Sequence, residues 1–216
     1  YVFKKNSPSC GVERVRVYDT ENMPSRRGRG LFAAAVMITL PLLPVEEEGR
    51  LNDPALRENF IERVFAYHRW QGALMSPKTA RALVEFHTRH KFLLLAHSER
   101  HYRRLGRLVA SIKALPLRAA YENYRRVLME CLAVQASTKK HANVLDHLTG
   151  YFSDHLSAPE RREMVDLIRD YRIGLVPVIA PITLIQHYVK KYQITYLAEQ
   201  VYLVPSPKEL MLRNHV

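Results

Sequence analysis

Four arginines, Arg100, Arg103, Arg104 and Arg107, are the residues whose type and spacing most clearly indicate chemistry. Their spacings of three, four and seven residues put all four on one face of a helix, and Tyr102 adjoins them. Like charges this dense repel one another, so an isolated helix gains nothing from them. A phosphate backbone would neutralise them and release its counterions. The pattern therefore favours a nucleic-acid contact on this face.

Three further basic runs occur downstream, each with a tyrosine or an amide within a few residues. The runs are Arg125 with Arg126, Lys139 with Lys140 and His141, and Lys190 with Lys191. The tyrosines that could stack on unpaired bases, or support guanidinium groups, are Tyr121, Tyr124, Tyr188 and Tyr192. Any one run is typical of a solvated helix face, so the nucleic-acid interpretation rests on the runs taken together.

Histidine pairs raise the question of a metal site. His87 and His90 are three residues apart, and His97 and His101 are four apart, on predicted helices. Two ligands at such spacing can share one ion, but a catalytic zinc site needs a third protein ligand, and no HExxH pattern is present. We expect ordinary surface or core histidines here.

The two cysteines have different settings. Cys10 lies in the turn-like segment Ser7-Pro8-Ser9-Cys10-Gly11, where backbone N–H groups could hold an anionic sulfur species or tune a metal cluster. A lone cysteine in a turn is more often structural. Cys131 lies among apolar residues of a predicted helix, and we expect a core thiol. Two cysteines are too few for a disulfide framework, which favours a reducing, cytoplasmic compartment.

The positive charge is unevenly distributed. The 216 residues contain 33 Lys and Arg against 21 Asp and Glu, a net charge of +12, which points to a polyanionic partner. Residues 1–48 contain 7 basic and 6 acidic side chains, whereas residues 49–216 contain 26 and 15. The basic surface therefore belongs to the second part. No segment has the roughly 18 to 20 uninterrupted apolar residues that span a bilayer, and no secretory signal is present, so we expect no membrane partner.

The first part, residues 1–48, has the pattern of a partial α/β unit. Short strands are expected at residues 1–4, 12–18 and 42–47, and a helix at 31–40, after a Gly- and Arg-rich loop. One helix and about three short strands cannot close a sheet with two covered faces, so this part looks incomplete.

The second part, residues 49–216, reads as one all-α domain, which makes the chain mainly α. Helices are expected near residues 54–74, 77–96, 98–114, 117–135, 138–155, 158–172, 178–191 and 194–203. Caps or prolines mark starts at Asp53-Pro54, Ser76-Pro77, Ser98, Pro116 and the capping box Ser157–Glu160. No repeat of fixed period is visible, which argues against a solenoid.

Several motifs resemble two known families. Residues 5–11 (KNSPSCG), 28–33 (GRGLFA) and 44–53 (PVEEEGRLND) resemble the C-terminal part of the thiouracil desulfidase (TudS) domain. Residues 92–98 (FLLLAHS), 140–152 (KHANVLDHLTGYF), 170–177 (DYRIGLVP) and 200–203 (QVYL) resemble a YbgA-type helical domain. The second set extends across nearly all of residues 49–216.

Chains that join these two domains resemble the RudS family of bacterial tRNA 4-thiouridine desulfidases. In that family three cysteines hold a [4Fe-4S] cluster with one open iron that takes sulfur from the thiocarbonyl, and the helical domain binds tRNA. The resemblance implies that Cys10 is the third cluster ligand and Ser7 a catalytic hydroxyl that assists proton movement at the base. It also implies a helical, tRNA-binding domain over residues 49–216.

This sequence departs from the pattern in one respect. The two earlier cluster cysteines, and the acidic residue associated with them, precede anything present here, so we expect the chain alone to lack the cluster and the activity. Two alternatives stay open: a helical module that binds nucleic acid or protein without catalysis, and a desulfidase for free thiouracil.

Overall fold

The computed structural model describes residues 1–75 and 77–214, which form two compact units, Tyr1–Tyr67 and His68–Val216. The structure is 63% helical with 6% strand, so the predicted mainly α class is confirmed. The division between the units falls inside helix α2 (Pro54–Met75), later in the chain than the predicted domain boundary at residue 48. Asp53 caps this helix, because its Oδ1 accepts a hydrogen bond from the backbone N–H of Leu56 at 2.9 Å.

The first unit contains two separate two-stranded sheets rather than one closed sheet. Strand β1 (Val2–Phe3) pairs in parallel with β4 (Glu46–Glu47), with Phe3 opposite Glu47. Strand β2 (Val15–Tyr18) pairs antiparallel with β3 (Pro24–Gly28), with a register irregularity near Val15. Strand β3 corrects the sequence analysis, which expected a loop over these Gly- and Arg-rich residues.

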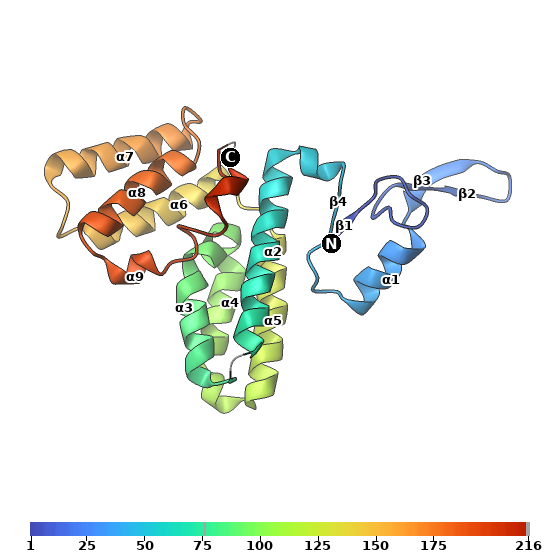
Figure 1. The fold of residues 1–216 in the computed structure, drawn as a ribbon, viewed down its shortest axis with the longest axis horizontal. Helices are drawn as coiled ribbons and strands as arrows, with labels where there is room; N and C mark the ends of the chain where they lie inside the picture. The colour runs from blue at the N-terminus through green and yellow to red at the C-terminus, as the bar shows by residue number, and fades with distance from the viewer. Residues whose placement is uncertain (76, 215–216) are drawn as a thin grey trace. The chain divides into compact units, whose positions relative to one another are not determined.

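Helix α1 (Leu31–Thr39) belongs to the first unit (Figure 1), where it shares a small core with β1 and the Cys10 turn. The buried residues of this core are Phe3, Val12 and Ala33, with Val36, Met37 and Val45 packed around them. The outer face of α1 leaves Leu31 83% exposed and Ile38 77% exposed. One side of α1 thus packs on β1 and the Cys10 turn, and the other side faces solvent.

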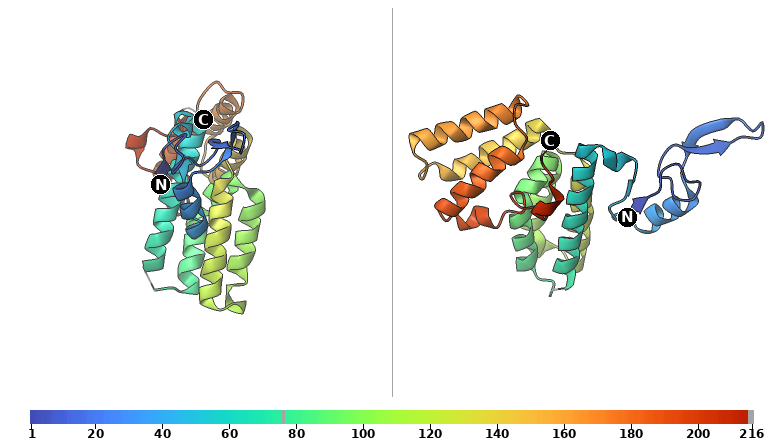
Figure 2. Two further views of the ribbon diagram at one scale, coloured as in Figure 1. Left: turned by 90° about the vertical axis from the view of Figure 1, so that its right-hand side faces the viewer. Right: turned by 45° about the horizontal axis from the view of Figure 1, so that its top comes forward.

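The second unit begins with the last turns of α2 and continues through α3 (Ala80–His97), α4 (Glu99–Ala110) and α5 (Leu117–Ala133). Figures 1 and 2 show α3, α4 and α5 running side by side, and each packs against the other two. Trp70 of α2 is 1% exposed and stacks on Tyr124 of α5, with ring centroids 5.4 Å apart. Phe86 of α3 meets the Trp70 ring edge-on at 5.1 Å. Aromatic packing therefore forms the centre of this bundle.

Helices α6 (Thr138–Thr149), α7 (Ala158–Arg172), α8 (Ile179–Lys191) and the short α9 (Thr195–Ala198) complete the second unit. Helices α6, α7 and α8 pack on one another, and α6 also packs on α3. Single 3-10 turns lie at η1 (Arg50–Asn52) in the first unit and at η2 (Ile112–Ala114), η3 (Gly150–Phe152) and η4 (Lys208–Leu210) in the second.

Capping residues explain where several helices begin. Ser98 accepts from the backbone N–H of His101, and Ser157 with Glu160 forms the predicted capping box. Ser76 lies outside the described residues. Helix α3 begins at Ala80, three residues later than predicted, because Thr79 caps it by accepting from Ala82 at 3.0 Å. Among the described helices, none combines the length and the apolar character that a membrane span requires.

Candidate functional site

Helix α4 presents its four arginines as one exposed face. Arg100, Arg103, Arg104 and Arg107 are all exposed, whereas Leu105 on the opposite side is fully buried. The amphipathic pattern explains this, since Leu105 packs against the bundle and the basic positions turn to solvent. The predicted helix face is therefore present in the fold. We call these four residues the arginine face.

Two members of the arginine face form ion pairs and two do not. Arg103 pairs with Glu99 one turn earlier, and Arg104 reaches Glu130 of α5 at 3.5 Å. Among the residues that the structure describes, no acidic side chain pairs with Arg100 or Arg107. Exposed pairs of this kind contribute about 0 to 1 kcal/mol, so they exchange readily for another anion. All four guanidinium groups are thus accessible to a phosphate.

Helix α5 extends the basic surface beside α4. Arg126 is exposed and donates to the side chain of Asn123 at 3.4 Å. It lies one turn before Glu130, the partner of Arg104, so it belongs to the same side of the α4–α5 pair. Arg125 is half-buried and lines a cavity of about 310 Å³ at the end of the bundle, with Trp70 and Lys78.

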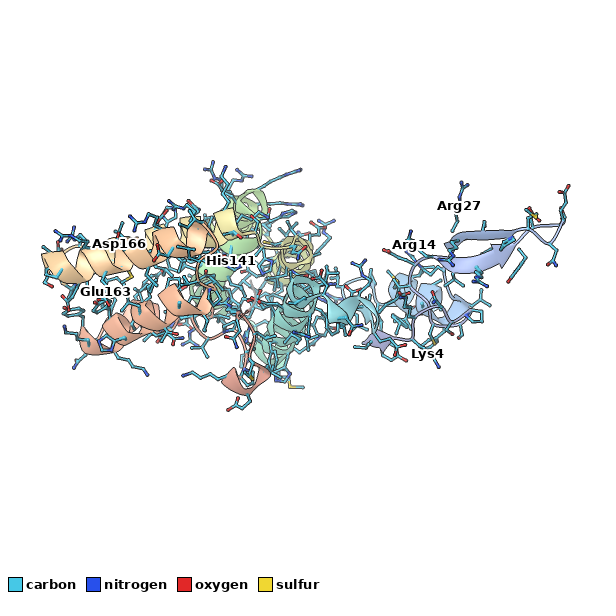
Figure 3. The ribbon with its side chains drawn as sticks, turned by 90° about the horizontal axis from the view of Figure 1, so that it is seen from above. Lys4, Arg14, Arg27, His141, Glu163 and Asp166 are labelled. Atoms are coloured by element: carbon cyan, nitrogen blue, oxygen red, sulfur yellow. The ribbon has the colours of Figure 1, made fainter. Side chains whose placement is uncertain are left out.

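The predicted basic residues of α6 are not equivalent. Lys139 is exposed, whereas Lys140 donates to the carbonyls of His97 at 2.7 Å and Gln135 at 3.0 Å. His141 is 4% exposed, and its Nδ1 lies 3.0 Å from the hydroxyl of Tyr202. Figure 3 shows the His141 side chain among the helices. Lys140 and His141 thus hold the fold together, and a phosphate contact would have to come from Lys139.

The lysines of α8 divide in the same way. Lys190 is exposed, and Lys191 is bound to Glu160, the residue that also completes the capping box of α7. The pKa of Glu160 is lowered to about 2 by hydrogen bonds, the largest of which comes from Lys191. Lys191 therefore joins α8 to α7, and Lys190 is the accessible cation of this pair.

The tyrosines predicted to stack on bases are largely internal. Tyr121, Tyr124 and Tyr188 are each 3% exposed or less, so no base can reach their rings. Tyr192 is half-buried and donates to Glu160 at 3.0 Å. The stacking prediction is wrong for the three buried rings, because their helical phase puts them in the core. Three other residues that sequence reasoning missed, Lys91, Tyr151 and Tyr196, lie together near the surface.

The histidine pairs have local structural partners. His97 donates to the carbonyl of Val134 at 2.7 Å, and His101 lies 2.8 Å from the hydroxyl of Ser98. His90 donates to the Phe86 carbonyl, and burial lowers its pKa to about 3. Burial also lowers the pKa of His87 to about 4, so both rings are neutral at neutral pH. The described residues contain no group of three or more His, Cys, Asp or Glu side chains that could hold a metal ion.

In the first unit, the Cys10 turn is organised by Ser7. The Ser7 hydroxyl accepts from the backbone N–H of Ser9 at 3.2 Å and of Cys10 at 3.1 Å, while its carbonyl accepts from Gly11 at 2.8 Å. A side chain at Gly30 would collide with the Ser9 carbonyl, since its Cβ would lie 2.2 Å away. The sequence motifs around Ser7 and Gly30 thus describe one tight turn that leaves Cys10 half-buried.

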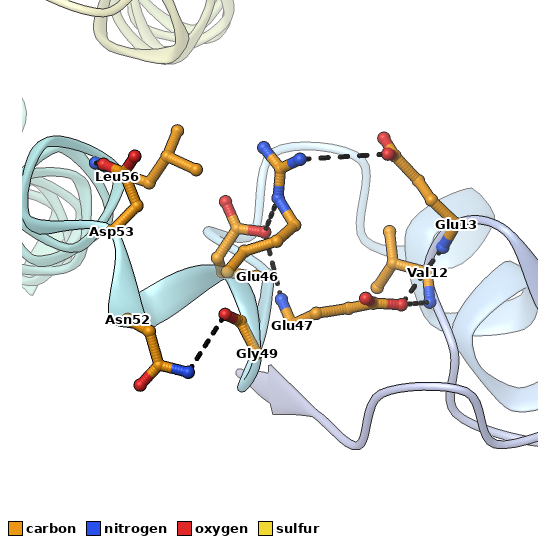
Figure 4. A network of polar contacts seen from close by, with 9 residues as sticks. Val12, Glu13, Glu46, Glu47, Gly49, Asn52, Asp53 and Leu56 are labelled. Carbon is orange, nitrogen blue, oxygen red and sulfur yellow. Dashed lines mark hydrogen bonds and ion pairs between the residues drawn. The ribbon is translucent and has the colours of Figure 1, made fainter.

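Glu47 supports the same turn from β4. The residue is 5% exposed, and its carboxylate accepts from the backbone N–H groups of Val12 at 2.6 Å and Glu13 at 3.2 Å (Figure 4). Arg50 pairs with Glu46 at 2.7 Å. A buried carboxylate needs such donors, because an unpaired one would be strongly destabilising. Glu47 of the acidic motif therefore stabilises the backbone segment that follows Cys10.

The residues present do not by themselves fit a [4Fe-4S] cluster. Cys10 is the single cysteine of the first unit. Cys131 is the predicted core thiol: it is fully buried, it contacts the carbonyl of Leu94 at 3.5 Å, and burial raises its pKa to about 12. A cluster ligand must be a thiolate, so Cys131 is no substitute. Of the three cysteine ligands that the resemblance implies, this chain contains a candidate for one, Cys10.

Comparison with known proteins defines the class. The family model described as "Protein of unknown function (DUF1722)" matches residues 91–207, which include the arginine face. The chain belongs to this family. It is similar to the "Uncharacterized protein YbgA" of Escherichia coli (strain K12), with 37% identity over 158 residues, 73% of this chain and 94% of that protein. No solved structure matches the chain.

Proposed function

We propose that the helical unit binds tRNA through the arginine face of α4 together with Arg126 of α5. The observation that carries the proposal is the exposed set of four arginines at helical spacing, two of them without an acidic partner in the described residues. One guanidinium group can bind two phosphate oxygens at once. When phosphates neutralise the arginines, the repulsion between the neighbouring positive charges is relieved.

Charge supports a sequence-independent contact. Residues 68–216 contain 23 basic and 12 acidic side chains, whereas residues 1–67 contain 10 and 9. If about six phosphates are engaged on a single strand, the log-log slope of affinity against salt is about −4. Such contacts position the RNA and carry little sequence information.

Binding of tRNA measured by fluorescence anisotropy, over a range of salt, tests the proposal. Replacing the four arginines by glutamine (R100Q/R103Q/R104Q/R107Q) is expected to reduce the magnitude of the salt slope by about 3, because four phosphate contacts are lost. The matched control removes four arginines from α7 (R161Q/R162Q/R169Q/R172Q), with the same change in net charge. We expect the control to retain most of the affinity.

Equal losses in the two variants would contradict an interface on α4 and leave only general charge attraction. Binding of wild-type protein that is undetectable or independent of salt would reject the RNA assignment and favour a protein-binding scaffold. Circular dichroism of both variants shows whether the fold is retained, so that a folding defect is not taken for a binding defect.

Cys10 supports a second part of the proposal: that the protein serves as a tRNA 4-thiouridine desulfidase, with Cys10 as one cluster ligand and the others supplied from outside this chain. The observation in its favour is the turn held by Ser7, Gly30 and Glu47, which leaves Cys10 half-buried. Ser7 has the further proposed role of a catalytic hydroxyl; in this turn it accepts the Cys10 N–H.

Anaerobic reconstitution with iron and sulfide tests this part. The chain alone is expected to hold no stable four-iron cluster and to leave 4-thiouridine in tRNA intact. A polypeptide that supplies the other cysteine ligands is expected to restore both cluster and conversion to uridine with wild-type protein and with C131S, but not with C10S. Activity that survives C10S would contradict the proposal. Conversion of free thiouracil but not of thiolated tRNA would assign the free base as substrate.

A further inference from the structure

Lys91 and three tyrosines, Tyr102, Tyr151 and Tyr196, form a cluster in the helical unit that the proposed function does not use. The four residues come from α3, α4, η3 and α9, so the fold brings together segments that are distant in sequence. We call them the tyrosine–lysine cluster.

Two rings of the cluster are in direct contact. Tyr151 stacks on Tyr196, with centroids 5.3 Å apart and planes inclined by 21°. The Lys91 ammonium lies 5.6 Å from the Tyr196 centroid and 5.6 Å from that of buried Phe92. Phe92 also meets Tyr151 edge-on at 5.9 Å. Cation–π contacts and stacked rings thus hold the cluster on a hydrophobic base.

All three phenol groups lie close enough to the Lys91 ammonium to act on its pKa. Burial by itself would lower the pKa of Lys91, but Tyr196, Tyr102 and Tyr151 raise it above its ordinary value. Burial is also the largest cause that raises the pKa of Tyr151, followed by Tyr196. At neutral pH Lys91 is therefore a fixed cation next to neutral phenols, a set of donors in a partly desolvated place.

The cluster reaches the surface on the side of α4 that packs against α3. Tyr151 is 40% exposed, and Lys91, Tyr102 and Tyr196 are half-buried. Tyr102 immediately precedes Arg103 on α4 and lies parallel to the ring of His87, with centroids 6.2 Å apart. One turn after Tyr102, a Cβ at Gly106 would meet only the His87 side chain at 3.9 Å, so the surface beside the cluster is open.

We propose that the tyrosine–lysine cluster is a subsite for one unpaired nucleobase of the bound RNA, which stacks on the exposed tyrosine rings while the arginine face, on the solvent side of the same helix α4, holds phosphates of neighbouring nucleotides. This inference rests on the proposed RNA binding and names the element recognised: a single-stranded or bulged nucleotide rather than a duplex. Aromatic platforms beside basic residues are a recurring way of binding unpaired bases.

The donors of the cluster select among bases. Lys91 can only donate hydrogen bonds, and the phenols donate readily, so the site favours a base edge rich in carbonyl oxygens. Uracil presents two carbonyl oxygens and guanine presents O6 beside the N7 acceptor, whereas adenine presents an amino donor and has no carbonyl. A preference for uridine or guanosine over adenosine at the unpaired position follows.

Two RNAs that differ only by one bulged uridine test the subsite. Wild-type protein is expected to bind the bulged hairpin more tightly than the fully paired one. Y151L, which loses the ring but keeps an apolar contact with Phe92, is expected to weaken binding of the bulged RNA by roughly 5- to 150-fold and to leave the paired RNA unchanged. Y151F keeps the ring and is expected to retain the preference, and so is the control Y192L, at the residue that directly follows α8.

The outcomes separate this inference from the proposed function. Equal weakening of both RNAs by Y151L, or no weakening, overturns the subsite and leaves RNA binding in place; a lowered Tm with equal weakening would make the cluster purely structural. Failure of wild-type protein to bind either RNA overturns both. If Y151L does not fold, K91M takes its place, with the same expectation of selective loss.

Photocrosslinking supplies an independent readout. A bulged RNA with 5-bromouridine at the unpaired position is expected to crosslink to a peptide containing Tyr102, Tyr151 or Tyr196, identified by mass spectrometry. Crosslinks confined to peptides outside the cluster would overturn the assignment. The same RNA with the modified base in the paired stem is the control and is expected to give little crosslinking to these peptides.

Discussion

The two halves of the helical unit contain nearly the same number of basic residues but use them differently. Residues 80–133, which include α3 to α5, have 11 basic and 4 acidic side chains, and residues 134–216 have 10 and 8. In the second half Arg172 pairs with Asp146 at 2.7 Å, Arg169 with Asp166 at 3.3 Å, and Lys191 with Glu160. In the first half each of the four acids, Glu85, Glu99, Glu122 and Glu130, also pairs with an arginine. The difference is the excess: the first half has seven more cations than acids, and the second half has two.

This difference shows which basic clusters indicate an anionic binding partner. A cation that bonds a carboxylate or a carbonyl within its own fold has its counter-charge already, as Lys140 and Lys191 do. An exposed row such as the arginine face has too few acids nearby, and its repulsion is relieved by an external anion. Sequence spacing alone did not distinguish the two cases, whereas the contacts do.

Reversing charge at Arg100 and Arg107, which pair with no acid among the described residues, is expected to have the largest effect. The double variant R100E/R107E replaces two cations by two anions on the arginine face, so both phosphate contacts become repulsive. We expect tRNA affinity to fall by roughly 100-fold or more at low salt, by analogy with lost phosphate contacts of about 1 kcal/mol each and the added repulsion. Filter binding measures the loss.

The control for this reversal lies in the second half. Arg162 and Lys190 are exposed and distant in sequence from α4, and R162E/K190E changes the net charge by the same amount. If the control weakened binding as much as R100E/R107E, the contrast between the halves would not hold, and the RNA would have to be attracted by total charge.

Helical phase made much of this fold predictable. Strong caps such as Ser98 and the Ser157–Glu160 box put helix starts within one residue of the prediction. The phase could also have identified His141, since it shares i, i+4 and i+7 spacing with Leu145 and Leu148, both fully buried. The phosphate prediction for His141 rested on its basic neighbours, Lys139 and Lys140, and not on this apolar spacing.

Other features depend on contacts that spacing does not reveal. The hairpin of β2 and β3 had a local signal: Asp19 accepts from the backbone N–H groups of Glu21 and Met23, and Asn22 has a φ of 59°, both typical of a turn. The tyrosine–lysine cluster had none, because its members come from four elements. Long-range packing of this kind needs the three-dimensional structure.

Lys139 and Lys140 are adjacent in the sequence, but Lys139 is exposed and Lys140 donates to two carbonyls, so they test the comparison at neighbouring positions. Removing the Lys140 ammonium in K140M leaves the carbonyls of His97 and Gln135 without this donor. We expect the free energy of unfolding to fall by about 1 to 2 kcal/mol, with little change in RNA affinity. Urea denaturation and anisotropy measure the two quantities.

For the adjacent Lys139 we expect the opposite result, an effect on RNA affinity and not on stability. K139M removes an exposed cation, so stability is expected to stay within about 0.5 kcal/mol of wild type while RNA affinity decreases slightly. An unchanged stability of K140M would show that its two carbonyl contacts contribute nothing in solution, and Lys140 would return to the set of candidate phosphate ligands.

Removing acids from the first half is expected to increase RNA affinity. Glu99 and Glu130 hold Arg103 and Arg104, so E99Q/E130Q frees two guanidinium groups and adds net charge of +2. Because exposed pairs of this kind contribute about 0 to 1 kcal/mol each, we expect a gain of a few-fold in affinity and little loss of stability. A decrease would indicate that the acids orient the arginines for phosphate.

The smallest effect is expected at Glu160, whose carboxylate pairs with Lys191 inside the second half of the helical unit. Hydrogen bonds from Lys191 first, then from Ser157, lower the pKa of Glu160 to about 2 from its ordinary 4.5. A depressed folded-state pKa contributes stability above about pH 4.5, and that contribution is lost as the pH falls toward 2. E160Q is therefore expected to lower Tm modestly at pH 7 and to match wild type near pH 2. K191M should reproduce part of this difference and K190M should not. A Tm difference independent of pH would mean that Glu160 acts through packing rather than through its charge, and the contrast with α4 would then rest on the arginines alone.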